Sequence, residues 1–243
     1  MPNDADNLKI EKKITKLFLK ANATYSLISD GDKILVALSG GKDSLCLLEI
    51  LAKRQKIHHP AFTLEAIHVR MDNVEYESDT SYLEEFATTL GVKLNVINTG
   101  FDDTIETRKP VCFLCSWYRR KAIFNYAQEH GFNKIALGHH MDDLIHTTLM
   151  NQFFQGSFTT MPARLSMRKM PLTIIRPLCM VEESYIKEHA KANGYRQQIK
   201  RCPYEKDSKR QDVSELFARI EQMNPEARYS IWNALEKEGK LIE

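Results

Sequence analysis

One stretch of 17 residues, Leu35–Leu51, constrains the fold of this chain more than any other. Its first four residues, Leu35–Leu38, are apolar and typical of a buried strand, and apolar residues return at helical spacing over Leu45–Leu51. Between them, Ser39–Ser44 has the sequence Ser-Gly-Gly-Lys-Asp-Ser. Two adjacent glycines let the backbone turn sharply and approach a ligand closely. The stretch therefore predicts a strand, a tight turn and a helix, as in α/β proteins.

The turn has the chemistry of an anion site. A helix that begins just after it points unpaired N–H groups and the positive end of its dipole into the turn, and Lys42 adds a mobile cation. The spacing excludes a Walker loop, which needs four residues between its first glycine and its Gly-Lys pair. The string instead resembles the pyrophosphate loop of the ATP pyrophosphatase superfamily, and we call it the phosphate loop. Its predicted ATP-binding residues are Ser39, Gly40, Gly41, Lys42, Asp43 and Ser44.

The rest of the chain alternates predicted strands and helices. Helices are expected at 7–29, from the phosphate loop to about 54, at 81–90, from the Cys112/Cys115 pair to 127, and at 142–154, 183–192 and about 212–222. Strands are expected at 33–38, 61–69, 92–97, 134–137 and 172–175. This order predicts a doubly wound, mostly parallel sheet of the Rossmann-like type. We expect an N-terminal helical segment (1–30), an ATP pyrophosphatase domain (31–181) and a basic C-terminal helical extension (182–243).

Polar residues follow three of these strands and should share one crevice, because ligands of parallel sheets bind at the carboxyl ends of strands. Besides the phosphate loop, the predicted nucleotide contacts are Met71, Gly138, His139, Asp142 and Asp143. The carboxylates there could hold Mg²⁺ against ATP phosphates. Capping of the following helix by Asp142 or Asp143 is the alternative, and both roles can coexist.

Cys112 and Cys115 form a C-x-x-C pair deep in the chain. The pair is compatible with a redox dithiol, a zinc site or an iron–sulfur cluster, and spacing alone does not separate these three. A late cysteine, Cys202, could be a third ligand. Cys46 and Cys179 are given no ligand role.

The net charge is only +2, but the basic residues are clustered. The acid-poor runs 108–121 and 161–176, with the mainly basic run 196–210, indicate a surface that could bind a phosphate backbone. The chain has no apolar run long enough to span a membrane. Its cysteine content is typical of cytosolic metal or redox chemistry rather than of a disulfide framework, so we expect a cytoplasmic protein.

The motifs occur together in one order: Ser39–Ser44, Cys112 and Cys115 ahead of Arg119-Arg120, Ala136–Asp143, Arg176–Leu178 and Cys202. With this combination the chain resembles the tRNA 2-thiocytidine synthetase (TtcA-like) family of the PP-loop ATP pyrophosphatase superfamily, over roughly residues 8–215. The resemblance implies ATP-dependent thiolation of a tRNA cytidine, at position 32 of the anticodon loop. The cytidine O2 would be adenylated and then exchanged for sulfur.

The resemblance also implies the cofactors and the roles of residues. Cys112, Cys115 and Cys202 would ligate a [4Fe–4S] cluster, Asp43 and Asp142 would hold Mg²⁺, and Lys42, Asp43 and the three cysteines would be catalytic. The predicted RNA-binding residues are Arg119, Arg120, Arg164, Arg168, Lys169, Arg201, Lys209 and Arg210. Trp117 and Tyr118 could stack on a splayed base or simply pack on their helix. We expect tRNA, a sulfur donor such as a cysteine desulfurase and a second copy of the chain as partners.

One departure from the family pattern is Glu205, which stands where many members have a second late cysteine. It puts a role for a second sulfur there in doubt. The alternatives are a cluster-free PP-loop tRNA ligase of the lysidine-synthetase type with zinc at its cysteines, thiolation of another tRNA nucleotide, and a non-catalytic ATP-binding regulator.

Overall fold

The computed structural model describes residues 4–76, 79–101, 110–201 and 209–243. Its helices are α1 (Asp4–Tyr25), α2 (Lys42–Gln55), α3 (Ser81–Leu90), α4 (Val111–Glu129), α5 (Met141–Gln155), α6 (Glu183–Ala192), α7 (Lys209–Met223) and α8 (Ala227–Lys237). Its strands are β1 (Lys33–Ala37), β2 (Thr63–Met71), β3 (Glu75–Tyr76), β4 (Lys93–Thr99), β5 (Lys134–Ala136), β6 (Arg164–Ser166), β7 (Thr173–Ile175) and β8 (Lys200–Arg201). No described helix is both long enough and apolar enough to cross a bilayer.

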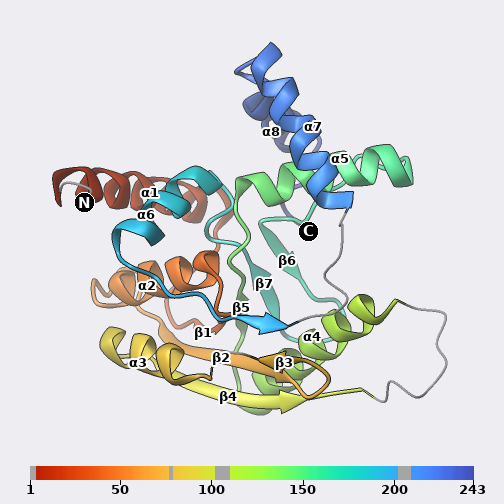
Figure 1. The fold of residues 1–243 in the computed structure, drawn as a ribbon. Helices are drawn as coiled ribbons and strands as arrows, with labels where there is room; N and C mark the ends of the chain where they lie inside the picture. Colours follow the sequence, from red (N-terminus) through yellow and green to blue (C-terminus); the bar gives the residue numbers. More distant parts are fainter. Residues whose placement is uncertain (1–3, 77–78, 102–109, 202–208) are drawn as a thin grey trace.

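Six strands form the central sheet in the order β4-β2-β1-β5-β7-β6 (Figure 1). The first five run parallel, and β6 pairs antiparallel with β7. From β1 the chain builds outward through β2 to β4, and it then returns to place β5 on the other side of β1. The strand order therefore reverses between β1 and β5, and this switch point is where ligands of such sheets bind. The predicted fold class is confirmed.

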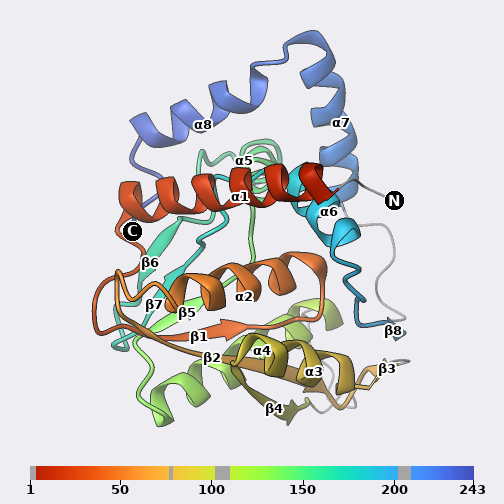
Figure 2. The same ribbon diagram turned by 90° about the vertical axis from the view of Figure 1, so that its left-hand side faces the viewer.

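Both faces of the sheet are covered, because alternate residues of β1 pack on opposite sides. Ile34 and Val36 join the larger core, whereas Leu35 joins a smaller core beneath α4. The larger core contains buried residues from all three segments predicted by sequence, including Phe18 of α1, Phe217 of α7 and Trp232 of α8. Figure 2 shows α1, α6, α7 and α8 gathered on the face of the sheet opposite α4.

The C-terminal part differs from expectation. The last helix predicted, at about 212–222, is α7, and the additional helix α8 follows it after Asn224-Pro225. After α8 the chain returns to the sheet, where Ile242 forms a bridge with Arg164 of β6. The two short strands β3 and β8, neither of which was predicted, pair antiparallel with each other. This pairing holds the segment that precedes residue 202 beside the carboxyl end of the main sheet (Figure 1).

Candidate nucleotide and cysteine site

The phosphate loop connects β1 to α2 at the switch point of the sheet. Gly41 is the N-cap of α2 without a side-chain cap, so the first N–H groups of the helix remain available to an anion. The loop is braced from within: Ser44 Oγ donates to the Gly41 carbonyl at 2.9 Å and lies 3.1 Å from Ser39 Oγ. These hydrogen bonds fix the conformation of the loop with the N-terminus of α2 open.

A second segment crosses over this loop. The N–H of Gln198 donates to the Gly40 carbonyl at 3.0 Å. Gly40 has φ +85°, and a Cβ atom there would lie 2.7 Å from Cβ of Gln198. Glycine is therefore required at position 40 both for its backbone conformation and for this close approach.

Lys42 is the cation of the loop, and it is held between two carboxylates. Its Nζ lies 3.1 Å from Asp43 and 3.0 Å from Glu183 at the start of α6, and 17% of its side chain is exposed. Burial disfavours the charge, but Asp43 and Glu183 outweigh burial and raise the pKa of Lys42. Lys42 therefore stays cationic at neutral pH, as a phosphate ligand must.

The second wall of the site follows β5 at Gly138–His140. His140 is buried among three carboxylates, with its ring nitrogens 3.5 Å from Asp142, 3.5 Å from Asp143 and 3.7 Å from Asp43. Burial opposes its protonation, but the three carboxylates prevail and raise its pKa. His140 is therefore more readily protonated than an isolated histidine, and its protonated form offsets part of the negative charge that would repel phosphates.

The two aspartates of this wall have different surroundings. Asp143 accepts the His140 N–H at 3.0 Å, as expected of a helix cap, and its other oxygen meets Arg210 at 2.7 Å. Asp142 accepts the N–H of Glu183 at 2.8 Å and pairs with Arg228 of α8 at 2.5 Å. Burial would raise the pKa of Asp142, but its hydrogen bonds and Arg228 lower it.

These contacts bear on the predicted magnesium site. Asp43 Oδ1 is buried and has no hydrogen-bond partner, and both Asp43 and Asp143 line the cavity next to the loop. Asp142 is engaged on both oxygens by protein groups. Among the described residues no group of three or more His, Cys, Asp or Glu side chains could hold a metal ion by itself. Mg²⁺ commonly binds through one or two carboxylates together with substrate phosphates, and Asp43 and Asp143 fit that pattern.

Cys112 and Cys115 lie near the start of α4, where a spacing of three residues puts both on one side of the helix. Cys112 is exposed and Cys115 is half-buried. Both line a cavity of about 580 Å³ whose other walls include Ser39, Asp43 and His139. The structure therefore brings the predicted cysteine pair and the phosphate loop to the same cavity. Cys202 lies outside the described residues.

His139 also lines a neighbouring cavity of about 690 Å³, whose walls include residues of α4. We call it the third cavity, because another one is described below. The Nε of Arg176 donates to His139 Nδ1 at 3.2 Å, and an Nη of Arg176 donates to the Pro162 carbonyl. Burial and the charge of Arg176 lower the pKa of His139 to about 4. At neutral pH His139 is therefore a neutral imidazole that carries its proton on Nε2.

The predicted RNA-binding residues fall into several environments. Arg120, Arg168, Lys169, Lys209 and Arg210 are exposed. Arg164 is half-buried on β6, Arg119 faces the nucleotide site, and Arg201 belongs to β8. The third cavity is lined by Trp117, Arg120 and Lys121 of α4 and by Met167 and Met170 near Arg168 and Lys169. Trp117 is 42% exposed. Two of the three basic runs thus border one cavity.

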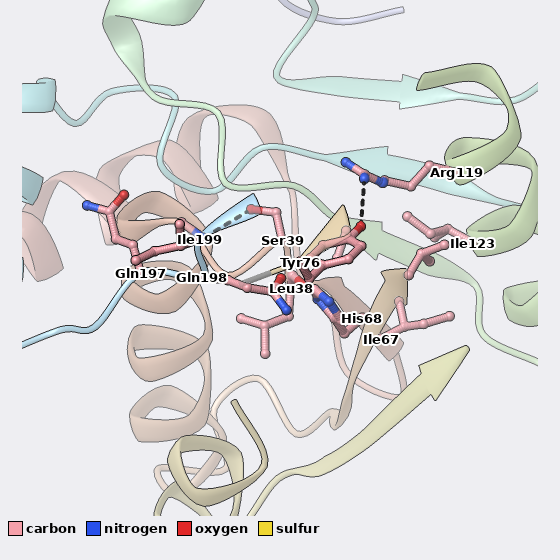
Figure 3. A pocket seen from close by; sticks show the side chains of 13 residues that line it. Leu38, Ser39, Ile67, His68, Tyr76, Arg119, Ile123, Gln197, Gln198 and Ile199 are labelled. Carbon is pink, nitrogen blue, oxygen red and sulfur yellow. Dashed lines mark hydrogen bonds between the residues drawn. The ribbon is translucent and has the colours of Figure 1, made fainter. Parts of the chain in front are cut away.

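A cavity of about 480 Å³ adjoins the one that contains the cysteines and lies between β2 and the crossing segment (Figure 3). Leu38, Ile67, Ile123 and Ile199 form much of its wall, and Ser39 and Gly41 form one end. Its polar side chains include His68, Tyr76, Arg119 and Gln198. Met71, a predicted nucleotide contact, is buried at the end of β2 and donates its N–H to Tyr76 Oη at 3.1 Å instead of lining this cavity.

Sequence reasoning missed several of these residues. His68 was read only as part of a strand, although a histidine within the apolar run Ala66–Val69 is itself a signal. Glu183 and Arg228 carry no local motif, and only the packing of α6 and α8 against the loop region brings them to Lys42 and Asp142.

A parallel sheet with a Ser-Gly-Gly-Lys-Asp-Ser loop at its switch point defines a PP-loop nucleotide-binding protein, and residues 6–213 match the PP-loop domain family. A tRNA-cytidine(32) 2-sulfurtransferase of Francisella tularensis subsp. novicida is 34% identical, covering 97% of this chain and 90% of the relative. The enzyme of that name from Dichelobacter nodosus is 35% identical, and the match covers 94% of this chain and 87% of the relative. The chain belongs to the tRNA-cytidine(32) 2-sulfurtransferase family of PP-loop proteins.

A solved structure agrees with the fold. The U34-tRNA thiolase NcsA from Methanococcus maripaludis, described with its [4Fe–4S] cluster, superposes with a TM-score of 0.78 at 24% identity. The match covers 98% of this chain and 81% of that one. The solved structure thus supports the α/β architecture. The family predicted from the motifs is confirmed by the domain match and by the two relatives.

Proposed function

We propose that this protein is an ATP-dependent tRNA sulfurtransferase that replaces the C2 oxygen of a cytidine, at position 32 of the anticodon loop, with sulfur. Family membership supports the reaction. The observation that carries it is the 580 Å³ cavity, because it brings the phosphate loop and the C-x-x-C pair to one space. Activation by ATP and delivery of sulfur can therefore take place at the same base.

In the first step the chain binds and orients ATP. The free N–H groups at the start of α2 and the Lys42 ammonium hold the β- and γ-phosphates, and Asp43 and Asp143 would hold Mg²⁺ beside them. The cytidine O2 attacks the α-phosphorus, the bond to the bridging oxygen breaks, and pyrophosphate leaves. The neutral His139, with its proton on Nε2, can donate a hydrogen bond within the cavity.

In the second step sulfur replaces the activated oxygen and AMP leaves, without net oxidation or reduction if the sulfur is at the sulfide level. A [4Fe–4S] cluster bound by Cys112, Cys115 and Cys202 would supply that sulfur. Two thiols one helical turn apart on an accessible cavity wall suit such a cluster. The roles of all the predicted site residues, Cys202 and Arg201 among them, and the domain limits at residues 30 and 181 stay predictions.

The partners follow from this chemistry. The tRNA is the substrate, a cysteine desulfurase or another sulfide source supplies sulfur, and we expect a homodimer that works in the cytoplasm. The exposed basic residues around the third cavity would bind the phosphate backbone.

The decisive experiment is a nucleoside analysis of tRNA from cells that lack the gene, with and without the wild-type protein. We expect 2-thiocytidine to be lost without the protein and restored with it, and unchanged 2-thiocytidine would refute the proposal.

Purified Cys115→Ser protein should lose iron, labile sulfide and thiolation but still bind ATP. Cys179→Ser is the matched control, because Cys179 is fully buried away from the cavity and burial raises the pKa of its thiol to about 12. A Cys115→Ser protein that retains both its iron and its thiolation activity would exclude the cluster assignment, and stoichiometric zinc in place of iron would favour the ligase alternative.

A further inference from the structure

Three side chains that line the 480 Å³ cavity each have a buried polar atom without a hydrogen-bond partner. Within the described part of the chain, eight buried side-chain nitrogen and oxygen atoms have no hydrogen-bond partner. Three of them, His68 Nε2, Arg119 Nε and Gln198 Nε2, belong to residues that line this one cavity (Figure 3). A buried polar group left unpaired costs about 1–3 kcal/mol. A ligand in this cavity could supply the missing partners.

The protonation of His68 follows from its one hydrogen bond. Its Nδ1 lies 2.7 Å from the carbonyl oxygen of Leu38, the last residue before the phosphate loop. A carbonyl can only accept, so the proton is on Nδ1 and Nε2 carries a lone pair. The residue is 2% exposed. Burial, with the charges of Arg119 and Arg70, lowers the pKa of His68 despite the bond to Leu38, so the ring is neutral at pH 7.

The shape of the cavity says which part of a nucleotide would occupy it. Ser39 and Gly41 of the phosphate loop form one end, and apolar side chains of Leu38, Ile67 and Ile199 form the walls. The adjoining cavity, which shares Ser39 and Arg119 with this one, contains the cysteines and carboxylates. A nucleotide with its phosphates on the loop therefore has an apolar slot for its base beside His68, and the reacting groups lie in the adjoining cavity.

We propose that His68 Nε2 accepts a hydrogen bond from the exocyclic 6-amino group of the adenine of ATP and so determines which nucleotide the protein uses. This inference rests on the proposed function and goes beyond it by naming the residue that reads the base. A guanine would place its 6-oxo acceptor against the Nε2 lone pair. The amide of Gln198 and the Nε of Arg119 provide donors for ring nitrogens and sugar oxygens.

The test compares ATP with purine riboside triphosphate, which has the same ring, sugar and phosphates but lacks the 6-amino group. We expect calorimetry on the full-length wild-type protein to show that ATP binds about 10-fold to 100-fold more tightly, because the analogue leaves Nε2 unpaired. In His68→Phe, which removes the acceptor but keeps a flat ring, the two dissociation constants should become nearly equal. His130→Phe, at an exposed position after α4, should keep the wild-type preference.

His68→Gln provides a second variant. Its amide oxygen can occupy a position near that of Nε2, so part of the preference for ATP should return, whereas a purely structural role of His68 would give no such rescue. If His68→Phe does not fold, the comparison of His68→Gln with the wild-type protein decides.

Other outcomes overturn the inference. Equal affinities of the wild-type protein for ATP and the analogue would show that the amino group is not read, and a preference unchanged in His68→Phe would show that another group reads it. A preference for ATP over 2′-deoxy-ATP that disappears in His68→Phe would place the sugar at Nε2 instead. Failure of the proposed function is distinguishable, because then no nucleotide binds or no 2-thiocytidine forms whichever base is offered.

Discussion

Gly138 lies against the backbone of the phosphate loop, so adding one methyl group there should lower the affinity for the nucleotide. A Cβ atom at Gly138 would come 2.9 Å from the carbonyl carbon of Asp43 and 3.0 Å from the nitrogen of Ser44. All three of the nearest atoms belong to the backbone of Asp43 and Ser44, so no flexible side chain can move aside. We expect Gly138→Ala to weaken ATP binding at least about tenfold, equivalent to 1.4 kcal/mol, as measured by calorimetry.

Gly156→Ala is the matched control for this prediction. Gly156 has φ +61° and open space around its Cβ position, so alanine there meets backbone strain without a collision. It should lose about 1 kcal/mol of stability and keep its affinity for ATP. If both variants lose stability alike and neither loses affinity, the contact between Gly138 and the loop has no role in binding.

Single residues also show where sequence analysis stops. The phosphate loop was predictable because its motif consists of six consecutive residues. The strand and the helix on either side of the motif orient it. His68 was not predictable, since its role depends on the carbonyl of Leu38, 30 positions away, which fixes the tautomer of its ring. A local sequence pattern does not predict the protonation of a side chain when a hydrogen bond to a distant residue determines it.

At the scale of elements, Glu49 joins α2 to α6 through buried hydrogen bonds. It accepts from His189 Nε2 at 3.2 Å and from the hydroxyl of Tyr195, and it pairs with Lys53 at 2.6 Å. Burial alone would raise the pKa of Glu49, but these hydrogen bonds lower it from 4.5 to about 2. This contact helps to hold α6, which carries Glu183, beside the phosphate loop.

A lowered pKa in the folded state predicts the direction of the pH dependence. The ionised Glu49 contributes its stability above pH 4.5, and this contribution disappears as the pH falls towards 2. We expect Glu49→Gln to lower the free energy of urea unfolding at pH 7 by up to about 3 kcal/mol. The difference from the wild-type protein should shrink below pH 4.5. Glu188→Gln, at an exposed position of α6, should change little, and a pH-independent difference for Glu49→Gln would contradict the account.

The elements that sequence analysis found and missed differ in how much of their structure is local. Helices α2, α3 and α6 and the strands of the parallel sheet were predicted within a few residues, because each has a clear apolar period and a turn at its ends. Strand β6 has three residues and none of them is buried, so it has no period to read. It exists because β7 and the returning C-terminus supply its hydrogen bonds.

At the scale of the whole molecule, the site is assembled from distant parts of the chain. The phosphate loop, the start of α4, the segment after β5 and the crossing segment before residue 202 meet at one edge of the sheet. The doubly wound topology predicted that the phosphate loop and the segment after β5 would lie close together. The approach of the crossing segment depends on the pairing of β3 with β8, two short strands that no pattern predicted.

The distribution of charge gives a prediction about tRNA binding. Arg168 and Lys169 are exposed in the turn after β6, beside the third cavity and its exposed Trp117. Each phosphate contact releases counterions and adds about 0.7–0.9 to the slope of log affinity against log salt concentration. For Arg168→Gln with Lys169→Gln, we expect weaker tRNA binding and a slope smaller by about 1.4–1.8, measured by filter binding at several salt concentrations.

The control for this charge prediction removes two equally exposed lysines, Lys12 and Lys16, from α1. Helix α1 lies away from β6 and α4 in Figure 1, so this double variant should bind tRNA with the wild-type salt slope. Equal changes in both double variants would mean that only net charge matters and that the basic surface has no preferred face. A change confined to Arg168 and Lys169 would place the RNA backbone along the rim of the third cavity, which shares His139 with the cavity that contains the cysteines.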